Sequence, residues 1–387
     1  MRASVALAGA GPAWFKAAPL ANESLLLRQL ALMTTVTKSK VFLVEQPLHK
    51  QLATIGVGAL GGLLFYWLGI PAGAMSGSIA ATALVSSLFP LSIAPLGKKL
   101  RLVAMLTSGV SIGAAVTPQT MQNVATYPAS VTAMMICVVI MTALSMFICM
   151  RFAKWDRATA LLASVPGALA YILSVISTTS ANTPRVVSVQ MIRVLFLMAI
   201  VPVLVAESGM HISNAQIRPD DSWSFFLIEC GISIVAGFLL GKLRIAGAML
   251  LAAMTVSAIA HGFDLAHGRT PMAALIAGQI LIGAWSGSRF AGFDWALFFR
   301  QSPAMVGSIS ATVVVAAGFA GLVSWGLGLP FGATFLAFSP GGFEAMAVLA
   351  LALGFDPFYV AAHHLARFFL LTFGMPLILR LVLTKKG

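Results

Sequence analysis

The sequence predicts an all-α polytopic membrane protein built from two inverted repeats, each with about five spans and one helix that a Pro-Gly pair breaks or makes re-entrant. Three observations predict this fold class: an apolar composition, a match of the chain with itself at one fixed offset, and basic loops that change sides between the two copies. The chain has 387 residues, of which 59% are hydrophobic and 9% are charged, and its mean hydropathy is +0.96. A soluble domain carries roughly 25% charged residues, so the composition indicates a membrane protein.

Apolar segments fill the chain from Leu52 to Leu383. A helix that crosses the bilayer needs about 20 mostly apolar residues. The candidate segments are 52–70, 72–90, 102–117, 129–150, 158–180 and 186–206 in the first half, and 223–241, 245–261, 271–288, 303–326, 331–354 and 358–380 in the second half. Each half of the chain therefore holds six.

The two halves match each other when the chain is shifted by 174 residues. Matches of Pro, Gly and Arg are informative in so apolar a chain, whereas matches of Leu or Ala are not. The informative pairs are "AGAM" at 72–75 with 246–249, Gly109 with Gly283, Gly113 with Gly287, Pro166-Gly167 with Pro340-Gly341, Arg193 with Arg367, and Pro202 with Pro376. These pairs indicate a duplication, with repeat 1 at 52–206, a connecting loop at 207–222 and repeat 2 at 223–383.

The basic loops of the two copies lie at different places. They are Lys98, Lys99, Arg101, Arg151, Lys154 and Arg157 after the second and fourth segments of copy one, and Lys242, Arg244, Arg289 and Arg300 after the first and third segments of copy two. Because basic loops stay in the cytoplasm, the copies are predicted to be inverted. Inversion requires an odd number of crossings per copy, and the fifth segment, which holds the Pro-Gly break, is expected not to cross fully. We expect ten spans and two broken elements; a plain twelve-span bundle stays open.

The net charge of +13 fits the cytoplasmic loops of a multi-pass protein of the bacterial inner membrane better than direct binding of nucleic acid. Residues 1–50 are expected to form a basic cytoplasmic leader. Cys137, Cys149 and Cys230 lie in or beside apolar segments without a C-x-x-C spacing. This spacing predicts neither a disulfide framework nor a zinc site, and we expect no metal and no cofactor.

Two motif matches lie within spans and are better explained by helix packing. "GVGALG" at 56–61 lacks the strand and the acidic residue of a dinucleotide site, and "GVSIG" at 109–113 lacks the setting of a nucleophile elbow. Small residues at this spacing let helices approach closely in lipid. The G-x-x-x-G pairs are Gly58/Gly62, Gly109/Gly113, Gly237/Gly241 and Gly283/Gly287.

The backbone breaks are the first candidate site residues: Pro340, Gly341 and Gly342 in copy two, and Pro166 and Gly167 in copy one. Proline removes a hydrogen-bond donor and glycine adds flexibility. Such a break is either a kink that serves packing alone, or the tip of a half-helix whose free N–H and carbonyl groups bind a substrate or an ion. Its occurrence in both copies favours the second interpretation.

Ionisable residues near the breaks are the second set. Glu344 lies one turn after the break, where it either stabilises a helix N-terminus or binds a proton or cation; copy one has Ala170 there, so such a site is asymmetric. Arg193 and Arg367 either snorkel to headgroups or lie buried beside a broken helix, paired with carbonyls, with Glu344 or with an anionic substrate. His363 and His364 lie one turn before Arg367, and His363, four residues before it, is expected to share its face. The two histidines provide either interfacial polarity or a titrating partner in proton coupling.

A few further residues have simpler expected roles. Asn182 and Asp356 occupy matching positions after the fifth segments and are expected to cap helices. Gln190 lies within a span and is expected to hydrogen-bond to another helix. Aromatic residues near segment ends, expected in the interfacial belts, are Trp67, Trp223, Trp325 and Tyr359.

Three stretches carry a resemblance to a known family: "SVPGALAYILSVIS", "SPGGFEAMAVLALALGFDPFYVAAHHLARFFLLTFGMPLILRL" and "IPAGAMSGSIAATAL". Together they resemble the Gram-negative AbrB family of duplicated membrane proteins, over about residues 52–383. Proteins of this family are described as regulators of gene expression or as ammonia monooxygenases. The family shares its name with a small soluble DNA-binding regulator that this chain does not resemble.

The function we expect is a secondary transporter or exporter of a small solute, with a coupling proton or cation and with membrane lipid as a partner. A membrane-bound regulator, as the family label implies, is the alternative; a homodimer is left open. A membrane monooxygenase is less consistent with the residues, because no histidine or carboxylate cluster has metal-ligand spacing, and His261 and His267 would have to converge with others. We therefore expect that the protein is not an enzyme.

Overall fold

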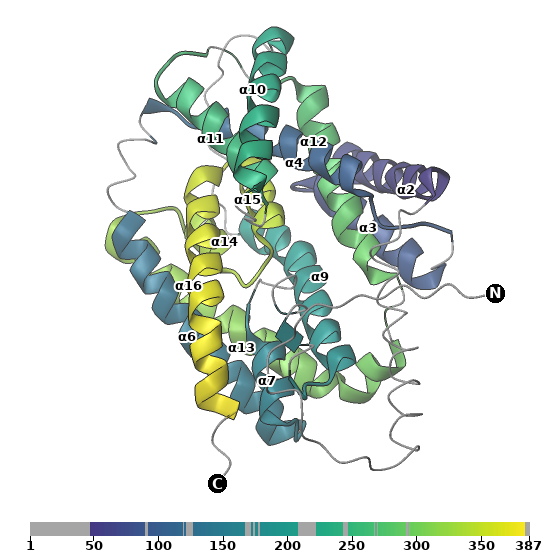
Figure 1. The fold of residues 1–387 in the computed structure, drawn as a ribbon, viewed down its shortest axis with the longest axis vertical. Coiled ribbons are helices and arrows are strands. Elements are labelled where there is room, and N and C mark those ends of the chain that lie inside the picture. Colours follow the sequence, from purple (N-terminus) through teal and green to yellow (C-terminus); the bar gives the residue numbers. More distant parts are fainter. Residues whose placement is uncertain are drawn as a thin grey trace, which may run out of the picture. The chain divides into compact units, whose positions relative to one another are not determined.

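A computed structural model describes residues 47–89, 92–118, 127–166, 179–207, 222–242, 247–266, 270–291 and 295–383, together with 120, 172, 175, 176, 268 and 293. All of these belong to one compact unit, residues 46–387. Every regular element among them is a helix (Figure 1). The predicted leader, the connecting loop and Gly167 lie almost wholly or wholly outside the described residues.

The helices follow the predicted apolar segments closely. The first half contains α2 (Leu48–Trp67), α3 (Gly73–Leu88), α4 (Lys98–Gly113), α6 (Tyr127–Phe152), α7 (Arg157–Ser164) and α9 (Thr183–Glu207). The second half contains α10 (Trp223–Gly241), α11 (Ala248–Gly262), α12 (Met272–Gly287), η4 (Ser288–Phe290), α13 (Trp295–Leu327), α14 (Phe331–Phe338), α15 (Phe343–Ala352) and α16 (Pro357–Leu383).

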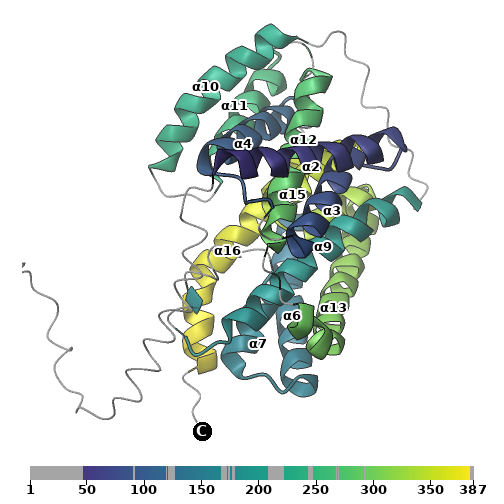
Figure 2. The same cartoon turned by 90° about the vertical axis from the view of Figure 1, so that its right-hand side faces the viewer.

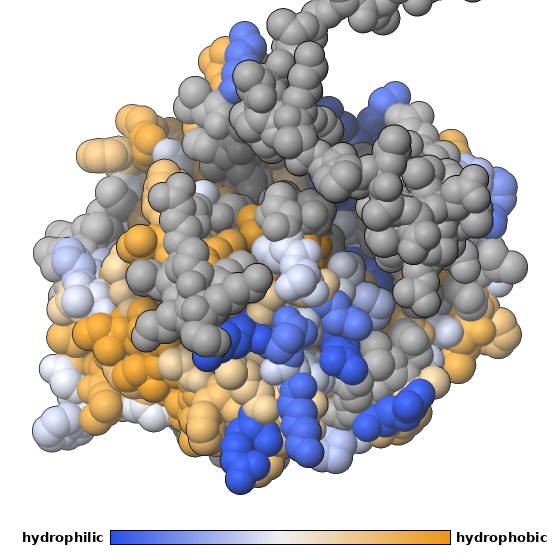
Figure 3. Space-filling model, turned by 60° about the horizontal axis from the view of Figure 1, so that its bottom comes forward, coloured by the Kyte–Doolittle hydropathy of each residue, from blue (hydrophilic) through white to orange (hydrophobic). Residues whose placement is uncertain are grey.

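Three stretches of helix are long and apolar enough to cross a membrane: Tyr127–Phe152, Trp223–Gly241 and Ser302–Leu327. Large apolar side chains on these helices face outward; Val235 and Phe238 of α10 are 62% and 59% exposed. Exposure of this kind is costly in water and expected in lipid. Figure 3 shows broad hydrophobic areas beside a group of hydrophilic side chains on one face. The protein is a helical membrane protein, and the number of its spans stays a prediction.

The helices form two groups (Figure 2). The A bundle consists of α2, α3, α4, α10, α11 and α12, and the B bundle of α6, α7, α9, α13, α14 and α16; most of the extensive helix contacts fall within one bundle. Helix α15 contacts α14 and α16 of the B bundle and also α4 and α12 of the A bundle. Each bundle thus takes three helices from each half of the chain.

Glycines bring helices of the two halves into close contact in the A bundle. A Cβ at Gly113 of α4 would lie 2.5 Å from the Met254 carbonyl oxygen of α11, and a Cβ at Gly287 of α12 would lie 2.6 Å from the Ile79 carbonyl oxygen of α3. Real Cβ atoms do not approach so closely, so the predicted packing role of these glycines is confirmed. Gly241 differs, because none of the described residues has an atom within 4 Å of its Cβ position.

Helices α4 and α12, which the 174-residue offset relates, run antiparallel. The guanidinium of Arg101, near the start of α4, lies 5.9 Å from the ring centroid of Trp285, near the end of α12. Further along, a Cβ at Gly278 of α12 would lie 3.2 Å from the hydroxyl of Ser108 on α4. One helix therefore begins where the other ends.

The break in the second half lies where the sequence predicts it. Helix α14 ends at Phe338, Ser339 has φ −56° and ψ 139°, and α15 begins at Phe343. Pro340 explains this geometry, because proline lacks an N–H group and pushes the residue before it out of the helical region. In the first half α7 ends at Ser164, and Val165, which precedes Pro166, is likewise extended.

Helix starts and aromatic positions test the remaining expectations. Asp356 accepts hydrogen bonds from the backbone N–H groups of Phe358 and Tyr359, and Asn182 accepts one from Arg185, so both are caps as predicted. The prediction for Tyr359 is wrong: its ring is 3% exposed and packs in the interior of the protein. Helix α6 covers Tyr359, and the position of Tyr359 near the end of an apolar segment gives no sign of this contact.

Candidate functional site

Two side chains of α9 hold the C-terminal end of α7. The Gln190 amide donates hydrogen bonds to the carbonyls of Leu162 (3.1 Å) and Val165 (2.9 Å). The Arg193 guanidinium donates to the carbonyls of Val165 (3.0 Å) and Ser164 (3.5 Å), and also to the Gln190 side-chain oxygen. The last carbonyls of a helix have no partner within that helix, and these two side chains supply it.

Two side chains of α16 hold the C-terminal end of α14 in the same way. Arg367 donates to the carbonyls of Ser339 and Gly341, each at 2.6 Å, and to His364 Nδ1 at 2.6 Å. Because arginine can only donate, Nδ1 of His364 accepts, and the ring proton is therefore on Nε2. This nitrogen lies 3.0 Å from the Leu336 carbonyl oxygen and donates to it.

The two arrangements correspond residue by residue at an offset of 174. The matching pairs are Gln190 with His364, Arg193 with Arg367, Leu162 with Leu336, and Val165 with Ser339. A positive side chain at a helix C-terminus is favourable because of the partial negative charge there. The same local chemistry thus stabilises both breaks.

Both arginines are buried, with 1% and 2% of Arg193 and Arg367 exposed. Within the described part of the chain, neither has a carboxylate within ion-pair distance, so their charges are met by neutral acceptors: backbone carbonyls, the Gln190 side-chain oxygen and His364 Nδ1. The two charges are near enough to act on each other. A buried charge is expensive in a membrane, and Arg193 Nε also has no hydrogen-bond partner among the residues that the structure describes. The snorkelling interpretation therefore does not describe these residues.

The N-terminal side of the second break carries Glu344. This residue is partly buried in the first turn of α15, and Gly342, at the N-cap, provides no side-chain cap. The Glu344 charge acts on Arg289, which stacks on Trp285 at 4.3 Å from the ring centroid. Pro340 and Gly341 are buried in the break, as is Pro166 in the other half.

His363 lies one turn before Arg367 on α16, as expected, but the histidine that hydrogen-bonds to Arg367 is His364. His363 is fully buried, donates from Nδ1 to the Tyr359 carbonyl (2.8 Å) and meets Ser130 of α6 through Nε2 (2.8 Å). On a helix, the residues three and four positions before Arg367, which are His364 and His363, point to opposite sides of the direction in which Arg367 points. Helix α14 lies on the flank of His364, and α6 lies on the flank of His363.

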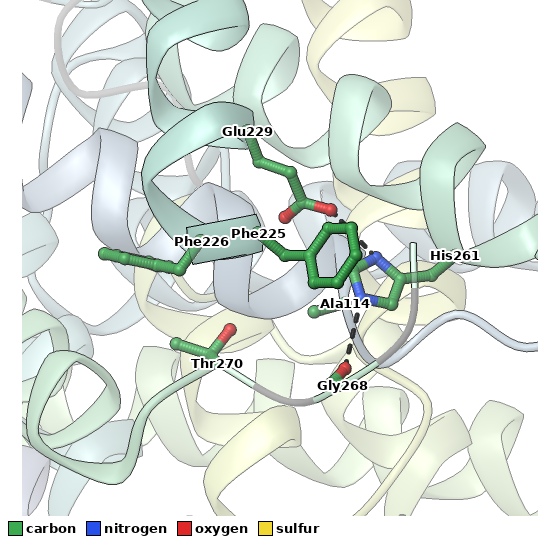
Figure 4. A pocket seen from close by; sticks show the side chains of 7 residues that line it. All are labelled: Ala114, Phe225, Phe226, Glu229, His261, Gly268 and Thr270. Carbon is green, nitrogen blue, oxygen red and sulfur yellow. Dashed lines mark hydrogen bonds and ion pairs between the residues drawn. The ribbon is translucent and has the colours of Figure 1, made fainter. Parts of the chain in front are cut away.

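A buried acid–histidine pair escaped the sequence analysis. Glu229 of α10 and His261 of α11 are 5% and 4% exposed, and Glu229 Oε1 lies 3.1 Å from His261 Nδ1 (Figure 4). Glu229 also accepts from Ser257 (2.9 Å), and His261 Nε2 lies 3.3 Å from the Gly268 carbonyl oxygen. The pair lines a small cavity with Thr270. The sequence feature that could have indicated this pair is Glu229, a single carboxylate within an apolar span.

The fold and these sites define a helical membrane protein with two short helices. A buried arginine donates hydrogen bonds to the carbonyls at the C-terminal end of each. The model of the AbrB family, described as "Transition state regulatory protein AbrB", matches residues 93–383, and the chain belongs to this family. A relative in Bacillus subtilis (strain 168), "Uncharacterized protein YhjN", is 27% identical over 370 residues, which cover 87% of this chain and 94% of the relative. The resemblance inferred from the break motifs is confirmed.

Proposed function

We propose that this AbrB-family protein is a multi-pass protein of the bacterial inner membrane that transports or exports a small solute, and that it is not an enzyme. One observation carries the proposal: the same arrangement of broken helix and buried arginine occurs twice in the B bundle. Secondary transporters bind solutes where discontinuous helices meet between repeats. Two hydrogen bonds recur at equivalent positions, from Arg193 or Arg367 to the carbonyl of Val165 or Ser339, and from Gln190 or His364 to that of Leu162 or Leu336.

Three relationships support inversion of the two repeats, for which we propose ten spans and two broken elements in all. The corresponding helices α4 and α12 run antiparallel. The halves pack reciprocally, α4 on α11 and α12 on α3. Antiparallel packing also brings Arg101 and Arg289 to the same end of the A bundle, which agrees with the side that the positive-inside bias assigns to both.

The two bundles suggest how access could alternate. The two bundles contact each other through α3 with α9 and through α16 with α4, and α15 lies against helices of both. Rocking of one bundle against the other around a fixed site is a common transport cycle. In this proposal the B bundle carries the two breaks and moves against the A bundle, in which glycines hold the helices tightly together.

The proposed substrate and ion site surrounds the breaks. Its residues are Pro166, Gly167, Arg193, Pro340, Gly341, Gly342, Glu344, His363 and Arg367. Arg193 and Arg367 fix the half-helix ends, and Glu344 binds the coupling proton or cation. The asymmetry at this position, with Ala170 in the first half, supports a single coupling site.

Flux into proteoliposomes tests the proposal. We would screen radiolabelled small solutes under an imposed proton gradient with the wild type, Arg367→Ala and Glu344→Gln. Arg151→Ala is the matched control, because Arg151 is exposed at the end of α6. We expect flux in the wild type and the control and a loss in both site variants. Absence of flux for every solute, or equal flux in all four proteins, would refute the assignment.

The description of the family model favours regulation of gene expression as a second candidate function. Transport of a metabolite could produce such regulation indirectly. The two are separated by measuring transcripts in a host that carries a folded, flux-deficient Glu344→Gln protein. Regulation that persists without flux would show a direct signalling role.

A further inference from the structure

We propose that Arg101 and Arg289, together with the N-terminus of α15, bind the anionic group of the solute, which makes the substrate a small carboxylate or phosphate compound. The inference rests on the proposed transport function and deepens it. It concerns the N–H side of the second break, whereas Arg367 holds the carbonyl side.

The first observation is the convergence of two arginines on one ring. Arg289 lies 4.3 Å and Arg101 5.9 Å from the ring centroid of Trp285, which is 8% exposed. The two like charges act on each other unfavourably. The attraction of a guanidinium for an aromatic face offsets only part of such a repulsion, so an anion between them would lower the energy of the arrangement.

The second observation is that the donors are unused. Among the described residues, neither Arg101 nor Arg289 has a hydrogen bond or an ion pair within 4 Å, and Arg101 Nε is buried without a partner. Each guanidinium carries five N–H donors. Arg193 and Arg367 differ in one respect, because guanidinium N–H groups of both donate hydrogen bonds to backbone carbonyls at the breaks.

The third observation is a helix N-terminus beside the arginines. Helix α15 has ten residues, starts at Phe343 after an N-cap, Gly342, that provides no side-chain cap, and contacts both α4 and α12, which carry Arg101 and Trp285. Its free N–H groups and its dipole favour an anion. Glu344 supplies one negative charge against the two positive charges of Arg101 and Arg289. The cluster therefore keeps an excess of one positive charge.

An anionic group bound between Arg101, Arg289 and the N-terminus of α15 would contact both the A bundle and the second break. Arg101 and Arg289 belong to α4 and η4, which pack in the A bundle, while α15 continues from the break that Arg367 holds. Anion binding would thus favour a particular placement of one bundle against the other. Two sources could supply the same chemistry, a soluble anion or an anionic lipid headgroup, and the proposal commits to the soluble anion.

The test is anion-dependent thermal unfolding of the full chain in an uncharged detergent. The probes are sodium succinate and potassium phosphate against sodium chloride at equal ionic strength, and phosphatidylglycerol against phosphatidylcholine in a separate arm. The variants are Arg101→Gln and Arg289→Gln, with Arg289→Lys as a milder change in case glutamine prevents folding. Arg185→Gln is the matched control, because Arg185 also stacks on a tryptophan, Trp155, at 5.7 Å.

We expect succinate or phosphate to raise the unfolding temperature of the wild type and of Arg185→Gln. The apparent affinity should fall about tenfold or more in Arg101→Gln and Arg289→Gln, as the loss of charge-assisted hydrogen bonds implies. Stabilisation by phosphatidylglycerol alone would overturn the solute assignment. No stabilisation by any probe, or equal stabilisation of every variant, would overturn the site. Anion binding in the absence of any liposome flux would refute the transport function and leave the site in place.

Discussion

Arg193 and Arg367 each donate a hydrogen bond to the carbonyl of the residue that follows a short buried helix, at 3.0 Å to Val165 and 2.6 Å to Ser339. The residues are 174 positions apart and perform the same task in the two halves of the chain. Because the task is local and chemical, its consequences can be tested separately from transport.

Replacement of Arg367 by Met should lower the free energy of unfolding strongly. The change leaves the carbonyls of Ser339 and Gly341 buried without their partner, and each such group costs about 1–3 kcal/mol. Thermal and denaturant unfolding in detergent measures the loss. Arg151→Met removes an exposed arginine and should change little; equal losses in both variants would contradict the structural role.

His364→Gln should preserve stability where His364→Ala does not. Gln190 already makes the equivalent contacts in the first half, with its amide group on Leu162 and its side-chain oxygen facing Arg193. A glutamine at 364 can donate to Leu336 and accept from Arg367 in the same manner. We expect a loss within about 1 kcal/mol for Gln and about 1–3 kcal/mol for Ala. A glutamine variant as unstable as the alanine variant would show that the halves are not equivalent.

The Glu229–His261 pair should show strong coupling in a double-mutant cycle. Removal of one partner leaves the other charge or polar group buried, which costs about 3–5 kcal/mol, whereas removal of both costs less than the sum. The proteins to compare are Glu229→Ala, His261→Ala and the double variant, by equilibrium unfolding in detergent. Additive losses would mean that the 3.1 Å contact contributes nothing specific.

Gly113→Ala and Gly241→Ala should change the free energy of unfolding differently, in sign or in size, although both replace a helical glycine. The new methyl group at 113 would meet the Met254 carbonyl, whereas the one at 241 enters open space. Overpacking costs about 1–3 kcal/mol, and an open helical position gains up to about 1 kcal/mol from alanine. Unfolding temperatures of the two variants check this; a destabilised Gly241→Ala protein would point to an unrecognised contact.

Cysteine labelling should place Lys99→Cys and Ala273→Cys on opposite sides of the membrane. The two positions correspond at the 174-residue offset, and both are exposed. The measurement uses a membrane-impermeant maleimide on intact cells and on inverted vesicles, with Cys137, Cys149 and Cys230 replaced beforehand. Labelling of both positions from one side would exclude inverted repeats.

Much of the fold could be predicted from the sequence, because its signals are local. Apolar runs set the helix limits, and Pro340 with its glycines marks the interruption that separates α14 from α15. The choice of His364 over His363 as the partner of Arg367 could not be predicted, since both lie one turn away on the same helix. Only the position of α14 on one flank decides between them.

The site was less predictable, because its partners come from distant segments. Glu229 and His261 lie 32 residues apart, and only the packing of α10 on α11 brings them together. Arg101 and Arg289 were recognised as loop charges on one side of the membrane. Their convergence on Trp285 depends on the antiparallel course of α4 and α12, which no local pattern encodes.

The hydrogen bonds of Arg367 have a mechanical consequence for the break. The guanidinium holds the carbonyl before Pro340 and the carbonyl after it, so it brackets the proline from both sides. Straightening or further bending of the chain at this point would have to pull one carbonyl away from the planar group. The break is therefore a rigid bend rather than a hinge, and α14, α15 and α16 should move together as one rigid body in any conformational change.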